Sequence, residues 1–316
     1  DKRRKRTVHT ADDKQRGAGE GDRTVPADRC ERTEAELSFR QKGRPECSER
    51  SERRKAAEIA DRRDMEMVKA VITAPRGSMG SLIVRAAHNR DGIEIVGGVG
   101  APGREYIGTD IGLAAGLGTE AGALVYDDIE KIIGECDLVI DFSTVELSMQ
   151  VLESCRRHGK AFICGTTGFT DEQTKQILEA AEVIPVMKAS NTSYVVNVMK
   201  ELLGQAAAKL GDKCRIEIID MHSETKKDAP SGTAIEFAEE MAAKSPDKSY
   251  DDITFHSVRA GNTPSTHTVI FGCMGEKLEI SHDAYDWNCY ASGACDAALF
   301  MEGKAPGSYT MEDVIR

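Results

Sequence analysis

The amino-acid sequence predicts an α/β fold with two parts: a doubly wound parallel sheet, and an α+β domain with an open mixed or antiparallel sheet. Short β-branched runs alternate with helical segments from Met65 onward, which is typical of a parallel sheet with helices on both faces. The first run leads through a glycine-containing turn into a helix. Near the C-terminal end, three runs alternate between apolar and polar residues, as in a sheet with one packed and one free face.

Length and composition narrow the class of protein. A chain of 316 residues is long enough for two ordinary domains. No apolar run approaches the roughly 18 residues of a membrane span, so we expect no membrane partner. The net charge of −11 argues against nucleic acid as a partner. The nine cysteines include no Cys-x-x-Cys pair, which indicates a reduced, cytoplasmic protein with no zinc or other metal site.

Residues 1–64 differ in composition from the rest of the chain. They carry 19 Lys and Arg against 15 Asp and Glu, a net charge of +4, whereas the remainder carries −15. Few of their side chains are large and apolar, so burial cannot offset the entropy cost of ordering them. We expect a disordered charged leader with at most a short helix at 49–64. The basic run 2–6 suits a nucleic-acid or targeting patch, but we favour a solvated tail or a mis-assigned start ahead of Met65 or Met67.

Residues 68–73 are a β-branched run that predicts the first strand. A glycine-containing turn and a helical segment at 81–88 follow, which is the order of elements around a dinucleotide-binding fingerprint. A Rossmann-like fold needs a tight turn there, so that a pyrophosphate can reach the helix N-terminus. We expect cofactor contacts from the turn residues Ala74, Gly77, Ser78, Met79 and Gly80.

Residues 93–99 predict the second strand. In NAD-binding folds of this class an acidic residue usually ends this strand and binds the ribose hydroxyls. Here the strand ends at Gly98 to Gly103, with Arg104 just beyond and no carboxylate. We therefore favour NADPH, or use of both cofactors, over NADH alone. An ordinary loop arginine at Arg104 is an equal alternative.

The alternation of strands and helices continues to the C-terminus. Strands are predicted at 123–126, 137–143, 161–168 and 183–189, and helices at 127–134, 145–158, 171–182 and 194–210. The second part is predicted to hold strands at 214–221, 253–260, 266–273 and 276–282 and a helix at 232–244, and a further helix at 290–301 follows it. We expect its three later strands to run antiparallel.

The stretch 220–234 joins a strand to a helix and carries most of the polar chemistry. Pro230 suits the first turn of the helix, where a missing N–H has no cost. Free backbone N–H groups that can bind an anion are then expected on Ser231, Gly232 and Thr233. His222 and Lys226 could converge on that anion, which suits proton transfer to a carboxylate-bearing substrate. On the residues alone, a strand-end histidine beside a solvated lysine turn is an equal alternative.

This stretch resembles the H-H-x-x-K-x-D-A-P-S-G-T-A signature of the dihydrodipicolinate reductase family. His222, Lys226 and the run 228–234 match the signature, and the resemblance extends over about 66–316. It implies that Gly165, Thr166 and Thr167 contact the nicotinamide half of the cofactor. It implies that the turn Ala189, Ser190, Asn191 and Thr192 closes over the nicotinamide.

Three positions depart from the family pattern. Ser223 stands where the family usually has a second histidine that contacts the substrate. Ala74 replaces the first glycine of the fingerprint, and its methyl group is tolerated only if its φ is negative. Trp287 stands where many relatives have arginine.

The resemblance implies NAD(P)H-dependent reduction of dihydrodipicolinate (4-hydroxy-tetrahydrodipicolinate) to tetrahydrodipicolinate, in lysine and diaminopimelate biosynthesis. His222 is the expected acid–base residue, with Lys226 the alternative proton donor. The substrate, a small dicarboxylate, is expected on Ser223, Lys226, Ser231, Gly232 and Thr233. Two other functions stay open: a related two-domain reductase or dehydrogenase acting on another small amino or keto acid, or a non-catalytic nucleotide-binding paralogue.

The resemblance also implies a domain arrangement and an assembly. We expect a dinucleotide-binding domain formed by 65–193 with 288–316, and a substrate-binding and oligomerisation domain at 194–287. Cofactor and substrate come from different domains, so closure about 193–197 and 286–290 is expected. The free face of the second sheet is expected to form a homotetramer.

Overall fold

The structure is a computed structural model that describes residues 67–316. The predictions made for residues 1–64, including the charged leader, lie outside the described residues.

A seven-stranded sheet forms the first part, with the order β11-β6-β5-β4-β1-β2-β3 and every neighbouring pair parallel. Its strands are β1 (Val68–Thr73), β2 (Ile93–Val99), β3 (Val125–Tyr126), β4 (Leu138–Asp141), β5 (Ala161–Cys164), β6 (Pro185–Lys188) and β11 (Gly307–Tyr309). The strand order reverses at β1, which is the switch point where doubly wound sheets bind ligands at the carboxyl ends of their strands. The predicted fold class is confirmed.

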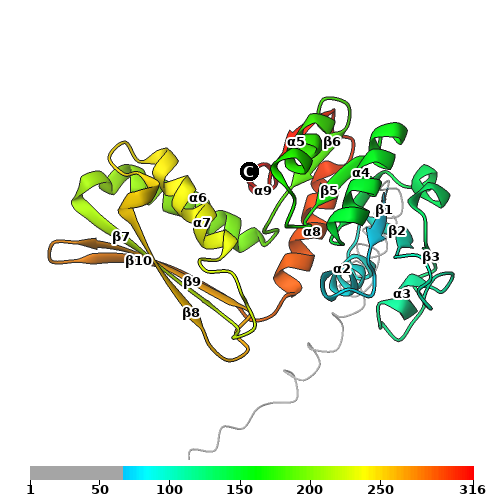
Figure 1. Cartoon of the computed structure of the whole chain (residues 1–316), viewed down its shortest axis with the longest axis horizontal. Helices are drawn as coiled ribbons and strands as arrows, with labels where there is room; N and C mark the ends of the chain where they lie inside the picture. The colour runs from blue at the N-terminus through cyan, green and yellow to red at the C-terminus, as the bar shows by residue number, and fades with distance from the viewer. Residues whose placement is uncertain (1–66) are drawn as a thin grey trace, which may run out of the picture. The chain divides into compact units, whose positions relative to one another are not determined.

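Helices cover both faces of this sheet (Figure 1). The helices are α2 (Ser78–His88), α3 (Ile111–Ala114), α4 (Val145–His158), α5 (Asp171–Ala180), α8 (Asn288–Met301) and α9 (Met311–Ile315). On one face α2 and α8 pack over alternate strand residues such as Ile72 and Ile140. On the other face α4 and α5 pack over the intervening residues, such as Val71 and Val139. The period of two along each buried strand therefore divides the core into two halves.

A four-stranded sheet forms the second part, with the order β10-β9-β7-β8. Its strands are β7 (Cys214–His222), β8 (Ile253–Arg259), β9 (Ser265–Cys273) and β10 (Lys277–Ala284). β9 runs antiparallel to β7 and β10, but β8 runs parallel to β7. The prediction of three antiparallel later strands is therefore wrong for β8. The connection from β7 to β8 passes through α7 (Gly232–Lys244), and such a helical crossover returns the chain in the same direction.

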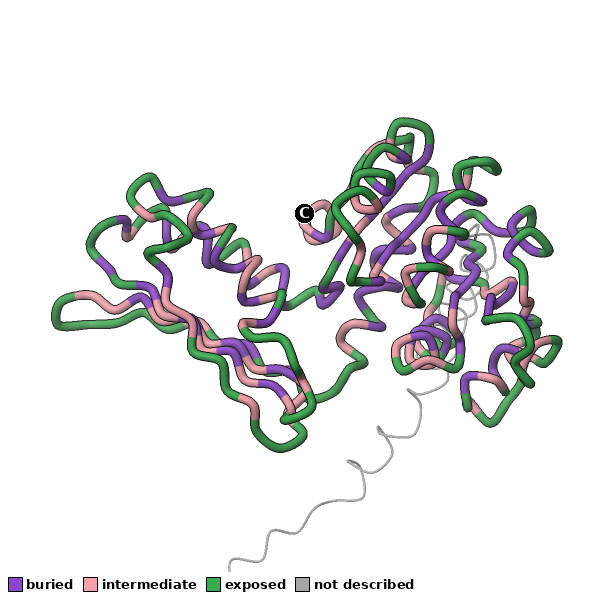
Figure 2. Tube along the Cα trace, viewed as in Figure 1, coloured by how far each residue is buried: buried purple, intermediate pink, exposed green. Residues whose placement is uncertain are grey.

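One face of the second sheet is covered by α6 (Tyr194–Leu210) and α7. Their buried residues, such as Leu203 and Phe237, pack on Ile216, Ile218 and Phe271 of the strands. Figure 2 shows buried positions alternating with half-buried ones along these strands. The half-buried residues form the other face, which carries no helix among the described residues.

Several element boundaries differ from the predictions. The helix predicted at 127–134 is two short 3₁₀ helices, η2 (Ile129–Lys131) and η3 (Ile133–Glu135). Further 3₁₀ turns precede β7 and β8, as η4 (Gly211–Lys213) and η5 (Tyr250–Asp252). The tail adds β11 beside β6, so the C-terminal residues complete the seven-stranded sheet.

Candidate active site

The fingerprint turn after β1 forms an uncapped helix N-terminus. Gly77 is the N-cap of α2, no side chain caps the helix, and its first turn holds no acidic residue. A Cβ on Gly80 would lie 2.0 Å from the carbonyl oxygen of Ala74, so only glycine fits this position. The N–H groups of Ser78 and Met79 point out of the first turn, where a helix offers its unpaired donors to an anion. These residues fit the pyrophosphate of a dinucleotide.

Ala74 has a φ of +46°, the one positive φ among the described residues other than glycine. Its methyl group was expected to be tolerated only at a negative φ, and that condition is not met. The left-handed conformation costs an L-residue about 1–2 kcal/mol, because Cβ crowds the following carbonyl oxygen. The turn keeps its glycine-like shape with an alanine in it.

A cavity of about 600 Å³ lies beside this turn. It is lined by the turn itself, by the loop that follows β2, and by the start of α4. Arg104 is one of its lining residues, together with Arg76, Ser143 and Thr144. The predicted cofactor residue Arg104 therefore lies beside the fingerprint, as the adenosine half of a dinucleotide requires.

A second cavity of about 600 Å³ joins the seven-stranded sheet to the stretch 220–234. From the first part it is lined by Met79, Phe142, Gly165, Thr167, Ser190, Asn191 and Thr192. From the second part and the connection to α8 it is lined by His222, Ser223, Thr225, Lys226, Asp228, Ser231, Gly232, Thr233, Pro264 and Trp287, and Tyr290 of α8 completes the lining. The structure thus brings together most of the residues that the sequence analysis assigned to the nicotinamide and the substrate. Ala189 and Thr166 are buried next to this cavity and do not line it.

One side-chain hydrogen bond links the two parts across this cavity, and another ties the turn after β6 to α8. Asn191 Nδ2 donates to Thr233 Oγ1 at 2.9 Å, and Thr192 Oγ1 donates to the carbonyl of Tyr290 at 2.7 Å. Asn197 Nδ2 donates to the carbonyl oxygens of Asn191 and Ser193, which fixes the turn before α6. The hydroxyl of Thr192 is therefore bound to the first turn of α8.

The helix α7 has the predicted bounds, but Pro230 does not lie in its first turn. Ser231 is its N-cap and Gly232 its first residue, so Pro230 lies before the helix, after a cis peptide bond from Ala229. The N–H of Ser231 donates to Asp220 Oδ2 at 2.7 Å, and its hydroxyl accepts from the N–H of Ala234. The prediction of a free N–H on Ser231 is therefore wrong. Gly232 and Thr233 still lie in the first turn of the helix, where N–H groups suit an anion.

A buried ion pair holds this helix start in place. Arg259 donates to Asp220 Oδ1 at 2.6 Å and to the carbonyl oxygen of Asp228 at 2.6 Å. Burial alone raises the pKa of Asp220, but the bonds from Arg259 and from the N–H of Ser231 outweigh it and hold that pKa below its ordinary value. Residues 39 positions apart in sequence therefore fix both ends of the signature loop. No local pattern marks this pair, and the sequence analysis missed it.

His222 is a buried side chain on the wall of the cavity. Burial, and then the positive charge of Lys226, lower its pKa below the ordinary value of 6.5, so the imidazole is neutral at pH 7. Its ring packs edge-on against His267 at 5.2 Å between centroids. His267 Nε2 in turn lies 3.1 Å from Ser231 Oγ, which ties the imidazole pair to the helix start.

Lys226 is a half-buried ammonium group at the same wall. Its Nζ lies 2.9 Å from Asp228 Oδ2, a carboxylate that is 60% exposed. An ion pair with so exposed a partner is weak, about 0–1 kcal/mol. A ligand carboxylate in the cavity can therefore replace Asp228 at small cost. The hydroxyl oxygens of Ser223 and the exposed Thr225 lie 2.8 Å apart and form a hydrogen bond.

Comparisons with known proteins agree with this geometry. Family profiles described as the N-terminus and the C-terminus of dihydrodipicolinate reductase match residues 68–192 and 195–315. Relatives named 4-hydroxy-tetrahydrodipicolinate reductase, from Hahella chejuensis and Geobacter metallireducens, are 36% and 37% identical over 265 residues. Each alignment covers 79% of this chain and 99% of the relative. The chain belongs to the dihydrodipicolinate reductase family.

The comparison with solved structures agrees with this family assignment. Dipicolinate-bound dihydrodipicolinate reductase from Paenisporosarcina sp. TG-14 superposes with a TM-score of 0.66 at 27% identity, covering 79% of this chain and all of that one. GenD2 from gentamicin A biosynthesis, in complex with NAD, gives 0.56 at 11% identity, covering 79% of this chain and 90% of its own. At that identity the second likeness concerns the fold alone.

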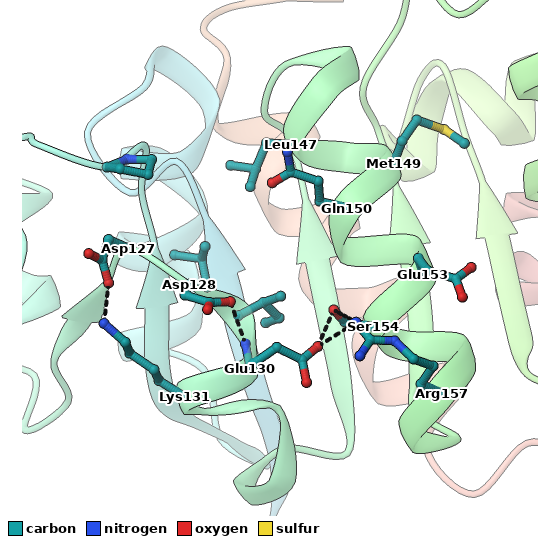
Figure 3. A pocket seen from close by; sticks show the side chains of 13 residues that line it. Asp127, Asp128, Glu130, Lys131, Leu147, Met149, Gln150, Glu153, Ser154 and Arg157 are labelled. Atoms are coloured by element: carbon teal, nitrogen blue, oxygen red, sulfur yellow. Dashed lines mark hydrogen bonds and ion pairs between the residues drawn. The ribbon is translucent and has the colours of Figure 1, made fainter.

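A third cavity of this dihydrodipicolinate reductase family member lies farther along α4, with a volume of about 780 Å³ (Figure 3). Both of its cations are paired with carboxylates on its own walls: Lys131 with Asp127 at 2.6 Å, and Arg157 with Glu130 at 2.9 Å. The lining also holds Asp128 and Glu153, so four carboxylates face two cations and the excess of negative charge disfavours an anionic ligand. Over residues 67–316, no cluster of three His, Cys, Asp or Glu could hold a metal ion. No helix in that range could span a membrane.

Proposed function

We propose that this protein catalyses the NAD(P)H-dependent reduction of 4-hydroxy-tetrahydrodipicolinate to tetrahydrodipicolinate, a step of lysine and diaminopimelate biosynthesis. The observation that carries the proposal is the single cavity that joins Gly165 and Thr167 of the parallel sheet to His222 and Lys226 of the signature loop. Relatives that share over a third of the sequence bear the name of this activity, and one related structure holds dipicolinate.

The cofactor is proposed to lie along the carboxyl ends of β1, β4 and β5. Its pyrophosphate would rest on the start of α2, and Arg104 would lie at the adenosine end, where an arginine suits NADPH. When bound, the reduced nicotinamide supplies the hydride. Thr167 and Asn191 line the cavity where that ring would lie, and they would exclude water from it.

The substrate is proposed to lie at the start of α7. The N–H groups of Gly232 and Thr233 face a carboxylate there, and Lys226 supplies the countercharge. Ser223 would offer a hydroxyl, or a bound water, in place of the histidine of relatives. The role of Ser231 is to cap the helix, since its N–H is already used.

Lys226 or His222 is the proposed proton donor. A neutral imidazole cannot give up a proton as readily as an imidazolium, so the lowered pKa of His222 favours Lys226 as the donor in the free protein. A bound dianion would raise the pKa of His222 again, because an opposite charge nearby favours the protonated form.

The direct test is a coupled assay. Pyruvate and aspartate semialdehyde are converted by dihydrodipicolinate synthase, and oxidation of NADPH or NADH is followed after this protein is added. Rapid oxidation that depends on the synthase supports the proposal, and the two cofactors are compared in the same experiment. Cofactor binding without oxidation would refute it.

Lys226→Ala is expected to lower kcat by about 10²–10⁴-fold, because it removes a countercharge and a proton donor together. Lys227→Ala is the matched control, since Lys227 is an exposed neighbour in the same loop and does not line the cavity. The control should retain the wild-type kcat. Near-normal kcat in Lys226→Ala would remove that residue from the mechanism.

We further propose a cytoplasmic homotetramer that assembles through the free face of the second sheet. On that face Ile219 and Ile270 are half-buried apolar residues among polar neighbours. Ile219→Lys should reduce the mass measured by sedimentation, because it places a charge inside the contact. Leu278→Lys, on the other face of the same sheet and exposed, is the control and should leave the mass unchanged. A wild-type protein that sediments as a monomer would contradict the assembly.

A further inference from the structure

Asp141, the last residue of β4, is a carboxylate with no exposed surface. Its Oδ1 accepts hydrogen bonds from the hydroxyls of Thr73, at 2.8 Å, and Ser143, at 2.6 Å. Its Oδ2 accepts from the hydroxyls of Ser148, at 2.5 Å, and Thr166, at 2.8 Å. Four segments of the chain therefore meet at one carboxylate.

We propose that Asp141 is a positioning residue that holds the two cofactor loops in register with each other. The inference rests on the proposed function, because it takes the loops after β1 and β5 as the cofactor site. Thr73 directly precedes the fingerprint turn, and Thr166 lies inside the turn after β5. Asp141 binds both through their hydroxyls, from the strand that lies between them.

The bonds reach the backbone of the loops as well as their side chains. Thr73 Oγ1 accepts from the N–H of Phe142 at 3.1 Å, and Thr166 Oγ1 accepts from the N–H of Ser143 at 2.9 Å. The carbonyl oxygen of Asp141 accepts from the N–H of Gly165 at 2.8 Å. Each hydroxyl is thus both donor and acceptor, so its rotamer is fixed by the network.

The energetics make this network stiff. A buried carboxylate is costly unless its oxygens are hydrogen-bonded, and hydrogen bonds to a charged group are stronger than neutral ones. Loosening any loop would remove a donor from a group that has no access to water. The cost of separating the loops is therefore concentrated at Asp141.

The position of the ring of Phe142 follows from this arrangement. A Cβ on Gly165 would lie 2.2 Å from that ring, so the ring packs directly on the turn after β5. Phe142 also lines the cavity in which hydride transfer is proposed. A shift at Asp141 would move the wall of that cavity and the fingerprint turn at the same time.

The test compares Asp141→Asn with Ser148→Ala in the full chain. Ser148 contributes one of the four hydroxyls, but from inside α4 and away from the cofactor loops. The dissociation constant for NADPH and NADH is measured by titration of nicotinamide fluorescence. Hydrogen exchange of the amides at 74–81 and 165–167 is measured on the protein without cofactor.

Asp141→Asn should weaken cofactor binding about tenfold, the lower end of what loss of an outer partner does to a bound group. It should also speed exchange in both loops, because an amide group cannot accept from four hydroxyls. Ser148→Ala should leave the dissociation constant within about twofold of wild type, because it frees no cofactor loop. If Asp141→Asn does not fold, Thr73→Val replaces it, with weaker binding expected and faster exchange at 74–81.

Two results would overturn the inference on its own. One is wild-type cofactor binding in Asp141→Asn, or in Thr73→Val where that variant replaces it. The other is equal weakening in Ser148→Ala, which would mean that the carboxylate acts only on overall stability. A wild-type chain that binds neither cofactor would instead refute the proposed function, and this inference with it.

Discussion

At the scale of single residues, Ala74 is the position where backbone and side chain conflict most clearly. Its φ of +46° suits glycine, and removing the methyl group should relieve about 1–2 kcal/mol of strain. Glycine also makes the unfolded chain more flexible, at a cost of about 0.5–1 kcal/mol. Ala74→Gly is therefore expected to raise the free energy of unfolding by roughly 0.5–1 kcal/mol, measured by urea unfolding.

Ala101→Gly is the matched control for this change. Ala101 is exposed in the next loop, and its φ is not positive. It has no strain to relieve, so glycine should lower the free energy of unfolding by about 0.5–1 kcal/mol. If both variants lose stability equally, the strain at Ala74 is not real.

The site residues show which information a sequence carries at this scale. His222 and Lys226 lie four positions apart after a strand, so their meeting at one cavity could be predicted from spacing. Asp220 and Arg259 lie far apart in sequence, and only the parallel pairing of their strands brings them into contact. The N–H of Ser231 donates to Asp220, whose position depends on the pair with Arg259. This hydrogen bond could therefore not be predicted from the sequence either.

At the scale of elements, the strands β7 and β9 place two histidines in contact. Burial, and then His222, lower the pKa of His267 from its ordinary value of 6.5 to about 3. The unfolded chain binds a proton at His267 below pH 6.5, whereas the folded chain does not. Stability is therefore fully present above that pH and is lost as the pH falls toward 3, by at most about 1.4 kcal/mol per pH unit.

His267→Gln isolates this contribution. The pKa values of His222 and His282 are also lowered by burial, and that of Asp220 lies below its ordinary value, so the wild-type protein loses stability from several groups on acidification. The variant keeps a hydrogen-bonding group beside Ser231 but cannot titrate. Urea unfolding between about pH 7 and pH 5 should show a decline shallower than that of wild type by roughly 1 kcal/mol per unit. Parallel declines would contradict the pKa of His267.

The order of elements was predictable, but one strand direction was not. In the seven-stranded sheet each strand is short, buried and followed by a helix, so local pattern and topology agree. In the second sheet both β8 and β9 were predicted as strands from their sequence pattern, and such a pattern does not reveal strand direction. The deciding feature is the helix between β7 and β8, which makes the pair parallel.

At the scale of the whole molecule, the proposed reaction needs groups from both sheets to close on one cavity. The connection from β10 to α8 carries Trp287, the only tryptophan in the sequence, and its side chain lines that cavity. The residue is 47% exposed, so its emission should be sensitive to a ligand that displaces water from it. Trp287 should therefore report the predicted closure about 286–290.

Binding of NADPH should quench the emission of Trp287, because the reduced nicotinamide absorbs where tryptophan emits. Dipicolinate added to that complex should shift the remaining emission to shorter wavelength, since closure removes the indole from water. Tyr285→Phe is the control, because Tyr285 is a neighbour with 95% exposure and should leave both signals intact. Trp287→Phe should abolish them. If dipicolinate binds by calorimetry and the emission does not shift, Trp287 stays in water and the two parts do not close over the ligand.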